Sequence, residues 1–385
     1  MSRWKTTALT QRLGLAAPIV QGPFGGGLSS VALTAAVCES GGLGSFGVHH
    51  LTGAQIEETA QAIRLKTKRP FALNLWVPHE NSEDPPLTDP QFEQHLSLLA
   101  PYFKELGEPL PTRPERFSPR YEDQVAGLLA ARPAVFSFVF GIPSPDILRQ
   151  CKALDIVTVG AATTPEEAMA LDSAGVDMVV ATGFEAGGHR VSFLRPPENS
   201  LTGTLALIPQ VVDAIKAPVI AAGGIADGRG IAAALALGAQ GVQIGTAFLA
   251  CVESSASDIH RQKLFSPDAR YTALTRAFSG RLARGIENRF MNELKAHEGG
   301  IAPYPVQNWL TGQLKPAAIA QGRTDLMSLW SGQAAPLLRH RDARSLMQAL
   351  QQQTDDALRR VAGSVCPSNR TCLMTTHGDR FTVEA

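Results

Sequence analysis

The chain has 385 residues, of which 44% are hydrophobic and 18% are charged, and its formal net charge is 0. These values exclude a globally disordered chain, and the lack of a basic excess argues against a nucleic-acid partner. The length suits two domains, one large domain with an appendage, or an α/β barrel with insertions. Five scattered cysteines without a CxxC pair predict reduced thiols and no metal site.

The N-terminal stretch lacks the apolar core of a signal peptide, so we expect a cytoplasmic protein. Residues 230–252 carry no charge and have the length of a membrane helix. Glycine and glutamine residues at 238–243 interrupt this stretch, however. We therefore predict a buried helix, a turn and a buried strand there, and no membrane partner.

Short apolar runs alternate with segments of helical periodicity up to about residue 250. Most runs are apolar on both faces, as expected of parallel strands that are covered on both sides. The runs lie at residues 18–24, 43–47, 71–77, 134–141, 156–161, 178–183, 218–223 and 241–248. This pattern predicts the α/β class and a (β/α)8 TIM barrel over residues 1–251, with an open doubly wound sheet as the alternative.

Residues 78–120 interrupt this alternation. They are rich in proline and charge around a short helix near residues 92–106, which predicts an insertion after the third strand, on the face where barrel loops carry function.

Residues 252–362 are predicted to form a mostly helical extension that partly returns to the barrel. Within it we expect an amphipathic helix over 272–297 with a break near Gly280, and a final helix that opens at Ser345. Residues 363–385 read as a loose tail.

The segment VVATGFEAGGHRVSF, residues 179–193, places two glycines and a histidine just after a predicted strand. In a parallel α/β fold, the loops at the carboxyl ends of strands hold the functional site. Gly187 and Gly188 allow a close approach to a flat ligand, and a His189 imidazole suits proton abstraction near neutral pH. The alternative is a loop histidine that only donates a hydrogen bond to a carbonyl.

Two later strand ends also carry glycines, Gly223–Gly224 and Gly245–Thr246. Loops after the last two strands of a barrel commonly hold a phosphate through backbone N–H groups. Tight helix–strand packing is the other explanation for these glycines.

Three further sequence features give weaker evidence of a functional site. The segment QGPFGGG, residues 21–27, lacks the G-x-G-x-x-G spacing of a dinucleotide site. Asn74 lies inside an apolar strand, where it either satisfies core backbone or meets a ligand. We expect His49 and His50 to lie in a solvated loop rather than in a pocket.

Several segments resemble the nitronate monooxygenase family, formerly called 2-nitropropane dioxygenases. EAGGH is the most specific of them, and the glycine-rich strand ends are shared by many flavin barrels. The similar segments are QGPFGGGLSSVALTAAVCESGGLG, FALNLW, VDMVVATGFEAGGHR, PVIAAGGIADGRGIAAALALGAQGVQIGTAFL and LWSGQAA.

The resemblance implies an FMN-dependent barrel that oxidises alkyl nitronates, and in some cases nitroalkanes, with O₂ to a carbonyl compound and nitrite. It implies His189 as the base, a nitro compound and O₂ as partners, and no metal; a monomer and a homodimer both stay open. The flavin contacts it implies are Gln21, Gly22, Pro23, Phe24, Asn74, Thr182, Gly187, Gly188, Gly223, Gly224, Gln243, Gly245 and Thr246.

The chain departs from the family pattern at three positions. The family usually has Gln at Thr182, often Met at Phe24, and Gly at Val191, and these changes bear on substrate choice more than on fold. FMN-dependent enoyl-acyl-carrier-protein reductases share the GGH and AGGI elements. An NAD(P)H-dependent FMN reductase acting on a quinone or an enoyl thioester is therefore the alternative, and a flavin-binding protein without turnover is the third.

Overall fold

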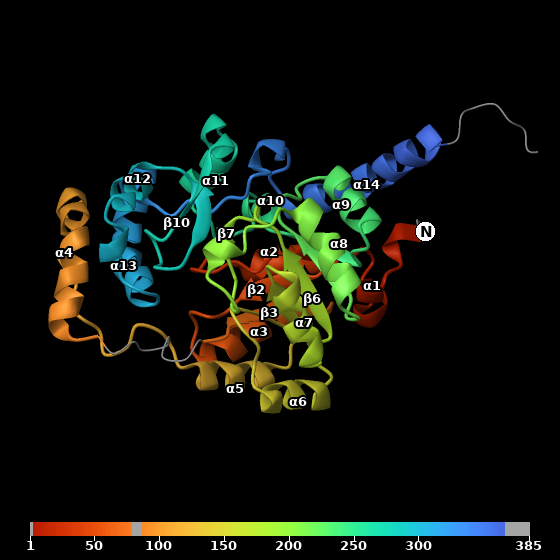
Figure 1. Ribbon diagram of the computed structural model, residues 1–385, viewed down its shortest axis with the longest axis horizontal. Coiled ribbons are helices and arrows are strands. Elements are labelled where there is room, and N and C mark those ends of the chain that lie inside the picture. The colour runs from red at the N-terminus through yellow and green to blue at the C-terminus, as the bar shows by residue number, and fades with distance from the viewer. Residues whose placement is uncertain (1–2, 79–86, 366–385) are drawn as a thin grey trace, which may run out of the picture.

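A computed structural model describes residues 3–78 and 87–365 of the chain (Figure 1). Eight parallel strands form one sheet in the order β1-β9-β8-β6-β5-β4-β3-β2. The strands are β1 (Ile19–Gln21), β2 (Gly44–Gly47), β3 (Phe71–Trp76), β4 (Val135–Val139), β5 (Val157–Ala162), β6 (Met178–Thr182), β8 (Val219–Ala222) and β9 (Gly241–Ile244).

The two ends of this sheet meet. The Gln21 amide donates to the Leu43 carbonyl at 2.9 Å, and the Leu43 amide donates to the Ile19 carbonyl at 2.9 Å. These bonds join β1 to the residue just before β2, so the sheet closes. The predicted (β/α)8 TIM barrel is confirmed, and the open sheet is excluded.

Helices pack around the barrel, and N-cap side chains stabilise the first turn of several of them. Thr164 accepts a hydrogen bond from the Glu167 amide, and Asp227 accepts one from the Arg229 amide, as expected of N-cap residues. The helices of this part are α1 (Ala8–Leu13), α2 (Val31–Glu39), α3 (Gly53–Lys66), α5 (Tyr121–Ala131), α6 (Pro145–Ala153), α7 (Pro165–Ser173), α8 (Thr204–Ala214), α9 (Gly228–Ala236) and α10 (Thr246–Leu249).

The uncharged stretch at 230–252 is helix, turn and strand, as predicted, but its last part differs. The eighth run was expected to stay extended through residue 248, whereas β9 ends at Ile244 and α10 follows. Gly245 has helical backbone angles, and α10 is apolar and buried, so periodicity alone does not separate it from a buried strand. Among the described residues, no helix is long and apolar enough to cross a membrane.

The extension contains α11 (Asp258–Leu264), α12 (Arg289–Lys295), α13 (Val306–Ala320) and α14 (Ala343–Val365). The predicted helix over 272–297 is confirmed at α12 and wrong before it. β10 (Thr272–Thr275) and β11 (Ala283–Ile286) are antiparallel there, and β11 also pairs with the short strand β7 (Gly188–His189). β11 is buried along its whole length, so it lacks the alternation that marks a half-exposed strand.

The final helix begins two residues before the expected Ser345. It continues to Val365, so the start of the predicted tail at 363–385 is helical, and residues 366–385 lie outside the described part of the chain. The division of the chain into domains at residue 251 stays a prediction.

The predicted insertion carries α4 (Asp89–Leu106), which packs on α13 at the edge of the molecule farthest from the N-terminus (Figure 1). The Tyr102 hydroxyl donates to Glu293 at 2.8 Å, which ties α4 to α12. The apolar face of α4 is buried through Phe92, Leu96, Leu99, Tyr102, Phe103 and Leu106. Residues 79–86 of the insertion lie outside the described residues.

Helices α3 and α5 touch through a glycine pair. A Cβ on Gly127 would lie 2.3 Å from the Gly53 carbonyl oxygen, which is far inside van der Waals contact. We expect Gly127→Ala to lower the free energy of unfolding by roughly 1–3 kcal/mol, because the helices must move apart. Urea unfolding measures this.

The matched control is Gly312→Ala, since Gly312 also lies inside a helix but has no atom within 4 Å of an added Cβ. This change should raise stability by roughly 0.5–1 kcal/mol through helix propensity. Equal effects of the two substitutions would contradict the glycine contact.

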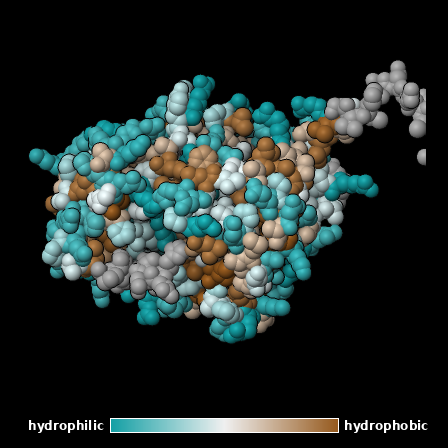
Figure 2. Space-filling view, viewed as in Figure 1, coloured by the Kyte–Doolittle hydropathy of each residue, from teal (hydrophilic) through white to brown (hydrophobic). Residues whose placement is uncertain are grey.

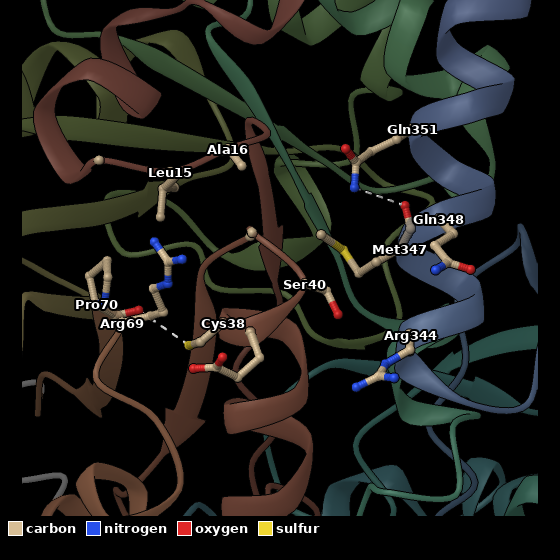
Figure 3. A pocket seen from close by; sticks show the side chains of 14 residues that line it. Leu15, Ala16, Cys38, Ser40, Arg69, Pro70, Arg344, Met347, Gln348 and Gln351 are labelled. Atoms are coloured by element: carbon tan, nitrogen blue, oxygen red, sulfur yellow. Dashed lines mark hydrogen bonds between the residues drawn. The ribbon is translucent and has the colours of Figure 1, made fainter.

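Two hollows lie at opposite ends of the barrel. The face of the molecule that Figure 2 shows is mostly hydrophilic, with smaller hydrophobic patches. One, of about 520 Å³, lies between α14 and the loops that precede β1, β2 and β3 (Figure 3). Its two arginines, Arg69 and Arg344, are exposed. The residues singled out by the sequence analysis lie at the other hollow.

Candidate functional site

A cavity of about 300 Å³ opens at the carboxyl ends of the barrel strands. The loops after β1, β6, β8 and β9 line one side, and residues 308–332 line the other. Every predicted site residue except Gln21 lines this cavity: Gly22, Pro23, Phe24, Asn74, Thr182, Gly187, Gly188, His189, Gly223, Gly224, Gln243, Gly245 and Thr246.

Gln21 does not line the cavity. Its side chain is fully buried; the amide nitrogen donates to the Gly22 carbonyl, and the amide oxygen accepts from the Ser45 amide at 2.9 Å. The bond to Ser45 joins β1 to β2, and the bond to Gly22 engages the other end of the side chain locally. Gln21 therefore holds the barrel closed rather than facing a ligand.

His189 is fixed by strand pairing and by one side-chain contact. Its backbone pairs with Ala283 of β11, and its Nε2 lies 2.8 Å from the Ser279 hydroxyl oxygen. That hydroxyl donates its single proton to the Arg281 carbonyl at 3.1 Å, so its oxygen accepts from Nε2–H. We assign the Nε2–H tautomer on this basis, which leaves the Nδ1 lone pair free to accept a proton.

Aromatic rings surround this imidazole. The ring centroids of Trp76, Trp330 and Phe140 lie 4.9, 5.4 and 6.2 Å from that of His189. Desolvation by these surroundings, followed by the charge of Arg281, lowers the pKa of His189 to about 3. The imidazole is therefore uncharged near neutral pH.

The glycines at the ends of β8 and β9 differ in what surrounds them, and Gly245 alone of the three leaves open space. Gly223 and Gly224 have φ of 101° and 70°, which favour glycine. A Cβ on Gly245 would meet one ring atom of Phe24, at 4.0 Å. Thr246 accepts a hydrogen bond from the Gly332 amide at 2.9 Å, which fixes the segment 330–332 beside these glycines.

The acid and the arginine of EAGGHR have structural contacts. The Glu185 carboxylate accepts from the backbone amide of Thr204, at 2.9 and 3.0 Å, and from its hydroxyl, and so caps the start of α8. Arg190 is buried and donates to the carbonyls of Gly183 and Ser200, each at 2.7 Å. Both side chains fix the loop that carries the histidine.

The structure bears on two of the weaker sequence expectations. Asn74 donates to the Ser137 hydroxyl at 3.0 Å, which is a side-chain and not a backbone partner, and it also lines the cavity, so its contact with a ligand stays a prediction. The solvated loop expected for His49 is wrong: the ring stacks on Trp76 at 4.0 Å and lines the cavity. Gln124 of α5 donates to the His49 carbonyl at 2.8 Å and holds this loop inward, whereas His50 is exposed.

The sequence analysis missed the residues that the extension contributes. Asn308, Thr311 and Lys315 of α13 line the cavity, and the Lys315 ammonium donates to the Gly26 carbonyl at 3.2 Å. These three residues lie far along the chain from the glycine loops, and no local sequence pattern identifies them as site residues. Trp330 and Ser331 also line the cavity, and the LWSGQ resemblance was their signal.

A second buried histidine supports this wall and gives a pH prediction. The Nε2 of His260 donates to the Trp330 carbonyl at 3.1 Å, and burial lowers the pKa of His260 to about 4. In the unfolded chain the pKa is near 6.5, so unfolding takes up a proton as the pH falls from about 6.5 to 4. We expect stability to fall over this range, with a His260 contribution of roughly 3 kcal/mol.

His260→Gln tests this, because glutamine keeps a donor for the Trp330 carbonyl but does not titrate. Urea unfolding at about pH 7 and about pH 4.5 should show a smaller loss of stability in the variant. An equal loss in both proteins would assign the pH dependence to other groups.

These features define the class of protein: a (β/α)8 barrel whose carboxyl-end loops present glycine backbone and an uncharged histidine to one cavity. Residues 6–353 match the family model described as nitronate monooxygenase. The chain belongs to the nitronate monooxygenase family, and it is an oxidoreductase.

The relatives agree along nearly the whole chain. A probable nitronate monooxygenase of Staphylococcus aureus (strain Newman) is 40% identical over 345 residues, which are 89% of this chain and 96% of the relative. One from Staphylococcus haemolyticus (strain JCSC1435) is 40% identical over 357 residues, which are 92% and 99% of the two chains.

Two solved structures are similar as well. Nitroalkane oxidase from Streptomyces ansochromogenes has a TM-score of 0.83 and 37% identity, and the match covers 92% of this chain and all of that one, 100%. FabK from Thermotoga maritima has a TM-score of 0.73 and 26% identity, with 93% and 99% covered.

Proposed function

We propose that this chain binds FMN in the cavity and oxidises alkyl nitronates with O₂ to a carbonyl compound and nitrite, with His189 as the base. The observation that carries the proposal is the convergence of an uncharged His189 and the glycines of the β6, β8 and β9 loops on one cavity. Family membership and the similarity to a nitroalkane oxidase support the choice of nitro compounds.

The residues present fit this cofactor. The open space beside Gly245 and the left-handed backbone at Gly223 and Gly224 suit a phosphate held by backbone N–H groups near Gly224 and Gly245–Thr246. Asn74, Thr182 and Gln243 would face the ring system from the strand ends. When bound, FMN supplies the redox chemistry between the nitronate and O₂.

The side chains of this chain bind, orient and move a proton. Ser279 holds the Nε2–H of His189, so Nδ1 is the nitrogen that accepts a proton from a nitroalkane and, once protonated, donates to an oxygen of the nitronate that results. Lys315 adds a positive charge to the cavity wall, which favours an anion. Trp76 and Trp330 limit the access of water to the imidazole.

The low proton affinity of His189 bears on the preferred substrate. A lowered pKa guarantees the free base but weakens the driving force for taking a proton from carbon. A nitronate is already ionised and needs no such step. We therefore expect nitronates to be better substrates than the corresponding nitroalkanes, in steady-state measurements of nitrite release.

Anaerobic reduction of the FMN-loaded protein tests the proposal. We expect a nitronate such as propyl-2-nitronate to bleach the visible flavin absorbance without NAD(P)H, and nitrite to appear on aeration. Bleaching by NADH and not by the nitronate would establish the reductase alternative. Bleaching by neither would leave a flavin-binding protein without turnover, and a protein that takes up no flavin would overturn every one of these functions.

A further inference from the structure

A cluster of aromatic rings holds a cation behind the wall of the cavity. The guanidinium carbon of Arg281 lies 4.0 Å from the ring centroid of Phe140, 4.3 Å from that of Tyr304 and 5.5 Å from that of Trp76. Trp76 and Phe140 also contact His189, with their ring edges and faces in T-shaped arrangements. The arginine and the imidazole therefore share two aromatic neighbours.

Within residues 3–78 and 87–365, no carboxylate forms an ion pair with Arg281. Its side chain is half-buried beside a small hollow lined by Val77, Pro78 and Ser118, and its Nη1 nitrogen is buried without a hydrogen-bond partner. Desolvating a charge is costly, and the ring faces offset part of this cost. The rings therefore hold the positive charge close to the imidazole that they also contact.

One turn presents both Arg281 and the hydroxyl that holds His189. The Arg281 amide donates to the Ser279 hydroxyl oxygen at 3.3 Å, and the Arg281 carbonyl accepts from that hydroxyl. Gly280 between them has φ of 78°, and a Cβ there would lie 2.4 Å from the Ala302 carbonyl oxygen. The turn is therefore fixed against the segment before α13.

The other charged and titratable groups around His189 do not replace this cation. Glu185 faces the cavity, but its carboxylate is engaged by Thr204. Lys315 lies on the α13 side. His49 stacks on Trp76 and is itself uncharged, because burial first of all lowers its pKa. Tyr304 belongs to the rings around Arg281.

We infer that Arg281 is a positioning residue whose charge, held against Trp76 and Phe140, adds to desolvation in disfavouring the charged form of the His189 imidazole and favours an anionic substrate in the cavity. A nearby cation disfavours protonation of an imidazole and attracts a nitronate. The part that concerns the substrate rests on the proposed function, and the part that concerns the imidazole does not.

Direct titration of His189 tests the inference without turnover. The full-length protein is labelled with ¹³C-histidine, the His189 signal is assigned with His189→Asn, and its chemical shift is followed against pH with and without FMN. We expect wild-type His189 to stay uncharged down to about pH 5. A wild-type imidazole that titrates near its ordinary pKa would overturn the inference, whether or not any variant folds.

Arg281→Met and Arg281→Lys form a matched pair, because methionine removes the charge and lysine keeps it. We expect the pKa of His189 to rise in Arg281→Met, by about one unit or a tenfold gain in proton affinity, and to stay near the wild-type value in Arg281→Lys. The KM for a nitronate should rise about tenfold in Arg281→Met with a smaller change in kcat, and Arg281→Lys should restore it.

An unchanged His189 titration in folded Arg281→Met would overturn the inference, since a purely structural role would not separate methionine from lysine by charge. If the pKa of His189 rises in Arg281→Met but wild type oxidises no nitronate, the effect of the charge stands and the proposed function is rejected. If wild type oxidises nitronates but the pKa of His189 does not rise in Arg281→Met, only the inference is rejected.

Discussion

His189→Asn is expected to lower the turnover of a neutral nitroalkane by roughly 10²–10⁴-fold, the usual contribution of a general base. Asparagine keeps a donor for the Ser279 hydroxyl, which lies 2.8 Å from Nε2, but it cannot accept the α-proton. A preformed nitronate needs no proton removal, so its oxidation should fall much less. Oxygen consumption with each substrate, on protein of equal FMN content, measures the two losses.

His49→Asn is the matched control, because His49 also contacts Trp76 and lines the cavity but does not contact Ser279. It should leave the ratio of nitroalkane to nitronate activity near that of wild type. Equal losses on both substrates in His189→Asn would refute the role of base and assign His189 to binding or to structure.

Gly245→Val is expected to weaken FMN binding by roughly 10–100-fold, the effect of losing one or two hydrogen bonds to a charged group. Gly245 has φ of −96°, which an L-residue accepts, so the backbone need not change. Its Cβ would enter the open space beside Phe24, where we place the phosphate. Quenching of FMN fluorescence gives the dissociation constant.

Gly299→Val provides the control, since Gly299 is exposed and an added Cβ there has no neighbour within 4 Å. Both variants should unfold near the wild-type temperature when free of FMN. Wild-type FMN affinity in Gly245→Val would place the phosphate elsewhere. A large fall in the stability of FMN-free Gly245→Val would instead assign this glycine to packing.

The barrel was predictable because its strands are buried on both faces and read as unbroken apolar runs. The prediction was wrong at β11 for a related reason. This strand is buried along its length, so nothing in the sequence separated it from a helix, and its partner β7 lies almost a hundred residues earlier. Local pattern therefore identified the core of the fold and not the hairpin that fixes His189.

The candidate site likewise contains residues that the sequence pattern identified and residues that it did not. The glycine loops and His189 were found because they directly follow strands, and the carboxyl ends of parallel strands meet at one rim. Lys315, Ser279 and Arg281 come from the extension, and only tertiary packing places Lys315 at the cavity and the other two near the imidazole. Gln21 was assigned to the flavin through its motif, but its side chain turns inward because it joins two strands.

A crystal structure of the FMN complex tests the central claim most directly. The account predicts a phosphate against the backbone at Gly224 and Gly245, and a ring system whose face lies beside His189 Nδ1. A flavin bound in the hollow beside α14, or one whose ring lies away from the imidazole with its phosphate far from these glycines, would contradict it.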